Sequence, residues 1–520
     1  MNLLVALPVL PVAVALWLAF SARAAQLGAG WVVALVALFP MAVAVMVSPV
    51  HIPLPGVLVL GTTSLVLDAA TQAALLLFGG LWLAAGLLLT RTREAGPSAI
   101  ALLLGLMGAL LLAIADGGPL VYAGMLATGY GLVAIIATEP GEDWRRAGRT
   151  LVILLVLSDL LVFELLLSLS AEPGVAPGFG LLLMGLAALA LRGAIPPGHV
   201  WLPVAMGSVS TPSAVLLAAV PTGAALVGGL KLLPDGAPEV ALLCLLLGLA
   251  GAAWVLLVGL LQTDPRSTLG YAVAATAALL LVAFPAGPGP EGQLPWLGLA
   301  LLVSCAVLPL VALLHTGWGR DLAIASMLLI HGLAGGHAAV HAGTALPLLP
   351  AFFAPLVAVA ATLVLTVAAR RTPAVTVDDG SVEPTRLAYT PVTLAAVGLG
   401  FAWTTSSPGF ASLWPAPVGI TLGLLAYRCL PARTRPAVAP GDLLGPVERF
   451  VSLLLRVVRV LSLRYLPRLR DRVEAVLLGL WNGEAWSRRM HKLDIRLRSW
   501  PATSLMMLVV ALGAAYLMAR

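Results

Sequence analysis

Charge is scarce in this sequence. Asp, Glu, Lys and Arg together make up 10% of its 520 residues, whereas hydrophobic residues make up 60%. Even a large water-soluble domain leaves much of its chain facing water, so it cannot hide this much apolar surface. The composition therefore excludes a soluble globular protein and indicates a chain that lies in lipid.

Lysine and cysteine are also scarce. Of the 29 basic residues, 27 are arginine, and the two lysines are Lys231 and Lys492. The cysteines, Cys244, Cys305 and Cys429, lie too far apart for a metal-binding spacing, so we predict neither a disulfide framework nor an iron–sulfur cluster. The sequence also lacks nucleotide and flavin motifs. We therefore expect no cofactor, no metal and no catalytic residues in this chain.

Long apolar runs recur from end to end, each long enough to cross a hydrocarbon core of about 30 Å. Because backbone polar groups in lipid must pair within the chain, these runs predict helices, and alternating strands of a barrel are not seen. We expect about 15 or 16 spans, beginning with a retained first span rather than a signal peptide. The clearest runs are 3–20, 30–48, 98–115, 149–170, 239–261 and 501–519.

Arginine-containing loops alternate along the chain with loops that contain none. The positive-inside rule places the arginine loops in the cytoplasm and the N-terminus outside, and the net charge of +6 suits a membrane surface rather than nucleic acid. Arg370 and Arg371 fit this pattern only if 321–342 and 345–369 are two crossings rather than one broken helix. We predict two. The other loop arginines are Arg23, Arg91, Arg93, Arg145, Arg146, Arg149, Arg266 and Arg320.

A different pattern occupies 441–499, where arginines alternate with apolar residues at helical spacing. This pattern predicts an amphipathic lateral helix on the cytoplasmic membrane surface, followed by a final span at 501–519. The helix can serve as a peripheral anchor or as a brace across neighbouring subunits.

Few ionisable residues fall inside the hydrophobic runs, and each is a functional candidate because charge is costly in lipid. They are Asp68, Asp116, Asp159, Glu164, Arg192, Lys231, His331, His337 and His341. Asp68 and Asp116 lie at span ends and can equally be helix caps. Asp159 and Glu164 lie deeper, and we expect Arg192 to pair with one of them. The histidines suit a proton relay or a set of packed, satisfied side chains.

Prolines interrupt the apolar sequence after Arg192. Residues 192–206 read RGAIPPGHVWLPVAM and precede GSVSTPSAVLLAAV at 207–220. A proline pair breaks the hydrogen-bond ladder of a helix and frees carbonyls beside a polar path. The stretch resembles the signature of the antiporter-like (L/M/N-type) membrane subunits of complex I, Mrp cation/proton antiporters and energy-converting hydrogenases. The matching residues are Pro197, His199, Trp201, Leu202, Pro203, Ala205, Thr211 and Pro212.

Three further stretches extend the resemblance over roughly 55–370. LGTTSLVLDAATQAALLLF at 60–78 is similar to the family's third-span segment, and TALPLLPAFF at 344–353 to its second broken helix. QTDPRSTLGYAVAATAA at 262–278 is similar to the segment that opens the second repeat. The family-motif residues of these stretches are Asp68, Asp264, Arg266 and Tyr271, and Asp116, at the end of the fourth predicted span, is a further one.

The resemblance implies an all-α polytopic fold with two inverted five-helix repeats, at 98–233 and 239–369. Ion sites would lie near the membrane midplane, at broken helices around Pro196–Pro197 and Pro347–Pro350. It also implies a multi-pass protein of a prokaryotic plasma (inner) membrane. The remaining segments are N-terminal spans at 1–97, additional spans at 389–430, the lateral helix at 441–499 and the final span at 501–519.

Most channel residues of that family are replaced here. The seventh-span lysine falls at Arg192, and arginine effectively cannot deprotonate in a protein. By register, the fifth-span glutamate falls at Met125. The other channel histidines and lysines fall near Ala218, Ala224, Cys305, Pro309 and Pro355. A substitute relay would use Asp159 or Glu164, His199, Lys231, His331, His337 and His341.

These features leave three interpretations open. The chain can be a membrane subunit of a proton- or sodium-translocating complex related to NADH-quinone oxidoreductase, with no redox centre of its own. It can instead be a scaffold that has lost transport, or a cation-conducting partner of an inorganic-carbon uptake complex. Its partners would be other membrane subunits and the bilayer, not nucleic acid. The neighbouring genes distinguish the first interpretation from the third.

Overall fold

The computed structural model describes most of the chain up to Cys429 and a short segment beyond it. The predicted lateral helix at 441–499, apart from Gly441, and the predicted final span at 501–519 lie outside the described residues. The described residues are 2–20, 28–54, 63–90, 95–139, 144–171, 178–233, 238–314, 317–346, 348–373, 384–404, 409–429 and 440–441.

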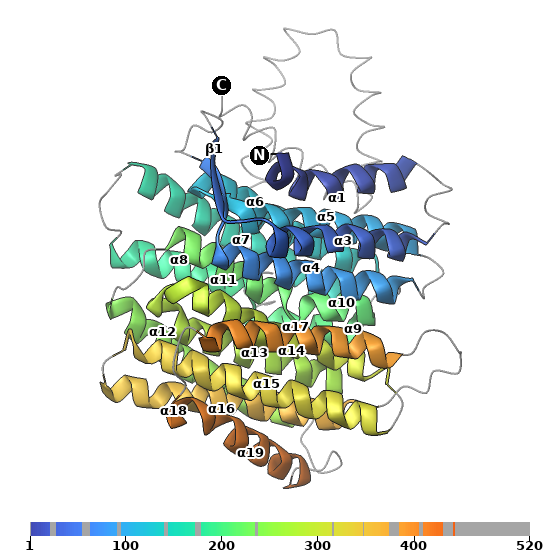
Figure 1. Cartoon of the computed structure of the whole chain (residues 1–520). Coiled ribbons are helices and arrows are strands. Elements are labelled where there is room, and N and C mark those ends of the chain that lie inside the picture. The colour runs from blue at the N-terminus through green and yellow to red at the C-terminus, as the bar shows by residue number, and fades with distance from the viewer. Residues whose placement is uncertain are drawn as a thin grey trace, which may run out of the picture.

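Long helices that lie side by side build the molecule (Figure 1). In the first half they are α1 (Asn2–Phe20), α3 (Ala29–Met46), α4 (Ala69–Leu89), α5 (Ala95–Ile114), α6 (Gly118–Ala137), α7 (Trp144–Ala171), α8 (Phe179–Arg192), α9 (Trp201–Ser208), α10 (Thr211–Leu217) and α11 (Val220–Leu232). In the second half they are α12 (Pro238–Leu261), α13 (Pro265–Ala283), α14 (Gln293–Val311), α15 (Trp318–Gly343), α16 (Leu348–Arg371), α17 (Pro384–Thr404), α18 (Phe410–Leu413) and α19 (Pro415–Cys429). Short 3-10 turns at Gly198–Val200, Phe284–Ala286 and Pro290–Gly292 complete the helical elements.

Twelve helices in the described part of the chain are long and apolar enough to cross a membrane. This confirms the all-α polytopic membrane fold. The number is below the predicted 15 or 16 partly because some helices are short, such as α8 with 14 residues and α19 with 15. The predicted span at 501–519 lies outside the described residues.

The hydrophobic core runs through both halves, and α13 and α14 are among its most completely buried helices. Every residue of α14 is buried, and so is every residue of α13 from Ser267 to Ala283. In contrast, α1 exposes Leu3, Leu16 and Trp17, each at least half exposed. A helix that is apolar all round and buried needs protein on every side, whereas α1 presents its apolar face outward, as a helix against lipid does.

A small antiparallel sheet lies at one end of the first-half helices. It contains β1 (Val50–Leu54), β2 (Thr63–Leu67) and β3 (Ala115–Asp116), in the order β1-β2-β3. The strands were not predicted from the sequence. Their register pairs Ser64 with Asp116, which brings the loop before α4 to the end of α5.

The loop arginines of the second half gather at the opposite end. Arg320, at the start of α15, donates to the carbonyl of Thr372, just after α16. Arg371 donates to the carbonyl of Leu260 at the end of α12, at 2.9 Å. Helix α15 therefore leaves this end and α16 returns to it. This confirms the prediction that 321–369 contains two crossings; which end faces the cytoplasm stays a prediction.

The first predicted helix break is present. Helix α8 ends at Arg192 after 14 residues, about 21 Å of helix, and therefore stops short of a full crossing. The chain continues through Pro196 and Pro197 before α9 starts at Trp201. Of the second proline-rich segment, 344–353, residues 344–346 follow α15 and residues 348–353 form the start of α16.

Candidate functional site

Arg192 lies at the C-terminal end of α8, where the helix breaks. Gly198 turns the chain so tightly that a Cβ there would lie 2.3 Å from the carbonyl oxygen of Ala190. One carbonyl freed by the break, that of Gly193, accepts a hydrogen bond from Thr222 of α11 at 2.8 Å. A cation is favoured at a helix C-terminus because the carbonyls there are negative.

The guanidinium of Arg192 is buried, and all three of its nitrogens donate within the bundle. The Nη2 group forms an ion pair with Asp159 of α7. The Nη1 group donates to the carbonyl of Met125 in α6, and Nε donates to Ser158 at 3.3 Å. The predicted pairing of Arg192 with an acidic residue of α7 is therefore confirmed.

Asp159 is satisfied from both sides. Its second oxygen accepts a hydrogen bond from the hydroxyl of Tyr130 in α6 at 3.0 Å. Glu164, the other predicted partner of Arg192, is exposed on the outer face of α7 and makes no ion pair among the described residues. The structure thus brings Asp159 to Arg192 and separates Glu164 from it.

Lys231 forms a second polar cluster, near the end of α11. Its ammonium donates to the carbonyls of Leu112 at 3.1 Å and of Ala113 and Ala115 at 2.5 Å each. These carbonyls belong to the C-terminal end of α5 and to β3. A cation in this position neutralises the helix end, so a structural role explains Lys231 without any transport step.

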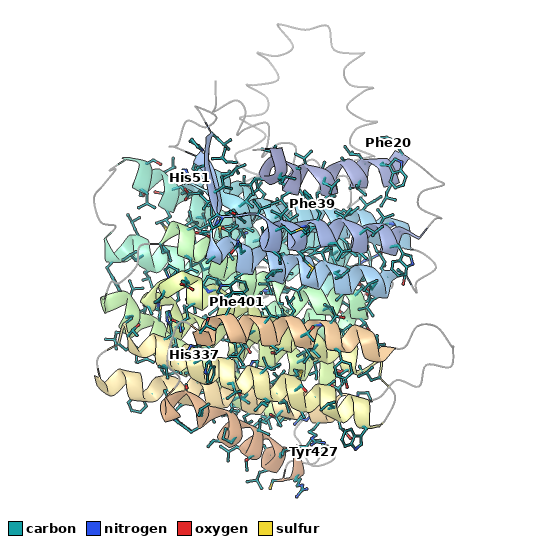
Figure 2. The ribbon with its side chains drawn as sticks, viewed as in Figure 1. Phe20, Phe39, His51, His337, Phe401 and Tyr427 are labelled. Atoms are coloured by element: carbon teal, nitrogen blue, oxygen red, sulfur yellow. The ribbon has the colours of Figure 1, made fainter. Side chains whose placement is uncertain are left out.

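The acids near Lys231 hold local structure. Asp68 caps α4 by accepting a hydrogen bond from the backbone N–H of Thr71 at 2.7 Å. Asp116 accepts from Ser64 at 2.7 Å, and His51 lies 3.7 Å from the same oxygen. His51 lies at β1, at this end of the molecule (Figure 2). The cap that the sequence offered as an alternative role is what Asp68 forms.

The family-motif residues of the stretch 262–278 lie where the second half contacts the first. Asp264 caps α13 through the backbone N–H of Ser267 at 2.7 Å. Arg266 donates to the carbonyl of Val209 at 2.5 Å and to Thr211 at 3.3 Å. The remaining motif residues shape the first-half turn: Trp201 and Pro203 begin α9, and Pro212 stands in the first turn of α10.

Glu139 is a buried polar residue that sequence reasoning missed. It follows α6 and accepts hydrogen bonds from the backbone N–H of Ser210 at 2.8 Å, from the Ser210 hydroxyl at 2.7 Å and from Ser213. Ser210 precedes α10, so Glu139 caps that helix from across the bundle. The sequence signal that could have indicated it is the serine–threonine–proline start of α10, because the backbone N–H groups of a helix N-terminus need acceptors.

His331 lies half-way along α15 and is fully buried. One ring nitrogen, Nε2, lies 3.0 Å from the hydroxyl of Thr276 in α13, and that hydroxyl lies 3.5 Å from the sulfur of Cys305 in α14. The other ring nitrogen has no hydrogen-bond partner among the described residues. All neighbours named here are uncharged, so the ring is held by neutral groups alone.

His337 and His341 lie farther along the same helix. His337 Nε2 lies 2.8 Å from the amide of Gln293 in α14 and 3.2 Å from the carbonyl of Ala402 in α17. His341 Nε2 lies 3.1 Å from the carbonyl of Gly287. His337 lies in the interior beside α17, as Figure 2 shows. The three histidines thus follow α15 from its middle toward one end, but they face different helices.

His199 follows the first break and contacts the second half. Its ring meets that of Tyr271 in α13 edge to face, with ring centres 5.8 Å apart. The hydroxyl of Tyr271 accepts a hydrogen bond from the backbone N–H of Gly441 at 3.2 Å. Gly441 is the first residue of the predicted lateral segment, so this segment begins against the helix that contacts His199.

The predicted pathway residues therefore fall into separate groups. Asp159 pairs with Arg192, Lys231 binds carbonyls, and the histidines of α15 bind neutral partners. The hydrogen bonds given above join members within each group and not one group to another. Within the described residues, no cluster of three histidine, cysteine, aspartate or glutamate side chains could hold a metal ion.

Comparison with known proteins finds similarity to one family of membrane proteins. The family model described as "NADH:quinone oxidoreductase/Mrp antiporter, TM" matches residues 150–299, which include Asp159, the break and α13. A subunit of the Mrp complex from Dietzia sp. DQ12-45-1b shares the fold with a TM-score of 0.69 and 16% identity. The matches support an antiporter-like subunit family for this chain.

Two more solved structures share the fold of this chain. A chain of respiratory complex I from Thermus thermophilus gives a TM-score of 0.51 at 19% identity, over 85% of this chain and 97% of that one. A chain of an archaeal membrane-bound sulfane sulfur reductase gives 0.62 at 14% identity, over 96% and 99%. The Mrp match covers 92% of this chain but only 62% of the other. No curated protein matches the sequence.

Proposed function

We propose that this chain translocates protons as a membrane subunit of a complex I- or Mrp-like assembly, and that the protons cross its second half. The family match and the fold support the membrane subunit. The similar structures are titled as an Mrp complex, a respiratory complex I and a respiratory membrane complex, which supports partner subunits beside this one.

The observation that carries the proposal is the environment of His331. It is buried half-way along α15, with one nitrogen at Thr276 and the other without a described partner. A neutral imidazole donates from one nitrogen and accepts on the other, so it can pass a proton without a fixed counter-charge. His337 and His341 extend this capacity by ten residues, about 15 Å along α15.

The gap from His331 to His337 is six residues, about 9 Å along the helix. No hydrogen bond between the two rings is present, so a proton would need water between them. Gln293 and Thr276, both buried and neutral, supply polar partners on either side of the gap. A relay here is therefore a hydrated chain and not a row of touching rings.

The test removes proton exchange while keeping polarity. In the purified complex, reconstituted into vesicles, the triple change His331→Gln, His337→Gln and His341→Gln should lower proton pumping at least tenfold. The matched control is His51→Gln, because His51 is an exposed histidine at β1. The control should pump at the unaltered rate, and both variants should keep the subunit ratio of the native complex.

A scaffold role is the second candidate, because the hydrogen-bonding groups of the Arg192–Asp159 pair are already taken up by neighbouring groups. Unchanged pumping by a fully assembled triple variant would overturn the proposal and establish the scaffold role. If the translocated ion is sodium rather than the proton, the measurements give a third result. In that case the triple variant would lose sodium flux, and pumping would depend on sodium concentration.

A further inference from the structure

Glu164 is the predicted site residue of α7 that has no polar partner among the described residues. Five residues earlier, Asp159 points inward and is satisfied by Arg192 and Tyr130. Glu164 is exposed and makes no hydrogen bond or ion pair among the described residues. A five-residue step turns a helix by about 140°, which explains why the two acids face opposite sides.

The surface around Glu164 is apolar along the helix in both directions. Leu160, one turn before it, is 62% exposed, and Leu167, one turn after it, is 39% exposed. Val156 and Leu157 continue the stripe. These residues recur at spacings of three and four, so they share one outward face of α7. We call this face the α7 stripe: Val156, Leu157, Leu160, Glu164 and Leu167.

The carboxylate lies inside the candidate span of α7 rather than at its end. The candidate span in α7 ends at Ser170, six residues and about 9 Å beyond Glu164. Glutamate has a short side chain, unlike lysine and arginine, which can extend along apolar surface to the interface. An ionisable group on a lipid-facing surface costs several kcal/mol, so it is rarely left without a partner.

We propose that the α7 stripe binds a transmembrane helix of a partner subunit, and that this helix places a lysine or arginine against Glu164. The inference rests on the proposed function, in which this chain is one subunit of a larger assembly. Charge complementarity selects the partner: a wholly apolar helix would bury the carboxylate unpaired, at a cost of several kcal/mol.

The neighbouring helix leaves room for such a contact. Helix α8 packs beside α7, and its outward positions near the same end include Gly180, which has no atom within 4 Å of a Cβ placed on it. Leu183, one turn farther along, is 42% exposed. Small residues let the backbones of two membrane helices approach closely. Gly180 and Leu183 thus give α8 a small and an apolar outward position beside α7.

Site-specific photo-crosslinking in native membranes tests the proposal. A photoreactive residue replaces Leu160 on the stripe or, as the matched control, Leu257 of α12, which is also 62% exposed but has no charged neighbour on its face. The Leu160 probe should capture one membrane subunit at a basic residue of its span. Glu164→Lys in the same chain should lower this yield at least fivefold, and changing the captured basic residue to Glu should restore it.

The outcomes separate this proposal from the proposed function. If the complex is recovered intact but Leu160 captures only lipid, or if Glu164→Lys leaves the yield unchanged, the docking proposal is wrong and the subunit role stands. If the chain purifies alone, without other membrane subunits, the subunit role itself is wrong. A triple-histidine variant that no longer pumps should still give the full crosslink at Leu160, since docking does not depend on transport.

Discussion

The two halves of the chain hold their buried polar groups in opposite ways. In the first half, Arg192 and Asp159 form a charged pair whose hydrogen-bonding groups are taken up by Tyr130, Ser158 and the carbonyl of Met125. In the second half, the hydrogen-bond partners described for the histidines of α15 are neutral: Thr276, Gln293 and the carbonyls of Ala402 and Gly287. A charged pair in a low-dielectric interior is fixed by its own attraction, whereas a neutral imidazole with one free nitrogen can exchange a proton.

At one position in each half, the family's ionisable residue is absent by resemblance, and a neighbouring helix supplies an ionisable side chain nearby. By resemblance, the fifth-span glutamate falls at Met125, and here the acid beside Arg192 is Asp159 of α7. By the same resemblance, a channel histidine falls near Cys305, and here His331 of α15 shares the Thr276 hydroxyl with Cys305. By this resemblance, the first position holds a fixed charged pair and the second a titratable ring. The difference predicts that only the second half transports.

The largest expected effect compares the two halves directly. The double change Arg192→Met and Asp159→Leu should leave proton pumping within about twofold of normal, whereas the triple histidine change should remove at least nine-tenths of it. Replacing a buried ion pair with apolar residues of similar size is often neutral or stabilising. Vesicle acidification by the reconstituted complex measures both variants.

A loss of pumping in the Arg192→Met, Asp159→Leu variant, with normal assembly, would break the comparison. The first half would then conduct, and the ion pair would be a moving part of its path. The subunit ratio of each purified complex is the control for assembly.

The second prediction concerns the cost of removing one partner. Arg192→Ala should lower the free energy of unfolding by about 3–5 kcal/mol, because it leaves the Asp159 carboxylate buried without its cation. Asp159→Ala should cost a similar amount. The double variant should cost clearly less than the sum, and chemical unfolding in mixed micelles measures all three. Additive costs would show that the two groups do not act as a pair.

Much of this arrangement could be read from the sequence. Hydrophobic runs gave the helices, PPGH at Pro196–His199 gave the first break, and loop arginines gave the two crossings of 321–369. A buried arginine needs an acidic partner, and in the structure Asp159 is that partner of Arg192. These predictions succeeded because each depends on a local rule: apolar length, a missing backbone donor, or the cost of a buried charge.

Other features needed the three-dimensional structure. The choice between Asp159 and Glu164 depends on which face of α7 turns inward, and both faces of this helix are apolar. The strands β1, β2 and β3 are short and pair across long sequence separations. Glu139 caps a helix 71 residues away, a contact that no local pattern indicates.

The third prediction concerns Lys231, the other basic residue of the first half that the sequence analysis names as a site candidate. Lys231→Met should lower the free energy of unfolding by about 2–3 kcal/mol, because the carbonyls of Ala113 and Ala115 lose a charged donor. Lys231→Arg is the control, since it keeps the charge and several donors. Pumping should persist in both variants. Normal stability with lost pumping in Lys231→Met would instead make Lys231 a transport residue.

The smallest expected effect concerns Tyr130, which completes the saturation of Asp159. Tyr130→Phe removes one hydrogen bond to the carboxylate and should lower the free energy of unfolding by about 1.5 kcal/mol. Tyr122 of the same helix is the matched control: its ring meets that of Phe163, and its hydroxyl has no hydrogen bond among the described residues. Tyr122→Phe should therefore change stability by less than about 0.5 kcal/mol. Because Arg192 still pairs with Asp159 in the Tyr130 variant, pumping should stay normal. If Tyr130→Phe altered the pH dependence of pumping, the Asp159 carboxylate would be exchanging protons. The first half would then take part in transport, contrary to the comparison drawn above.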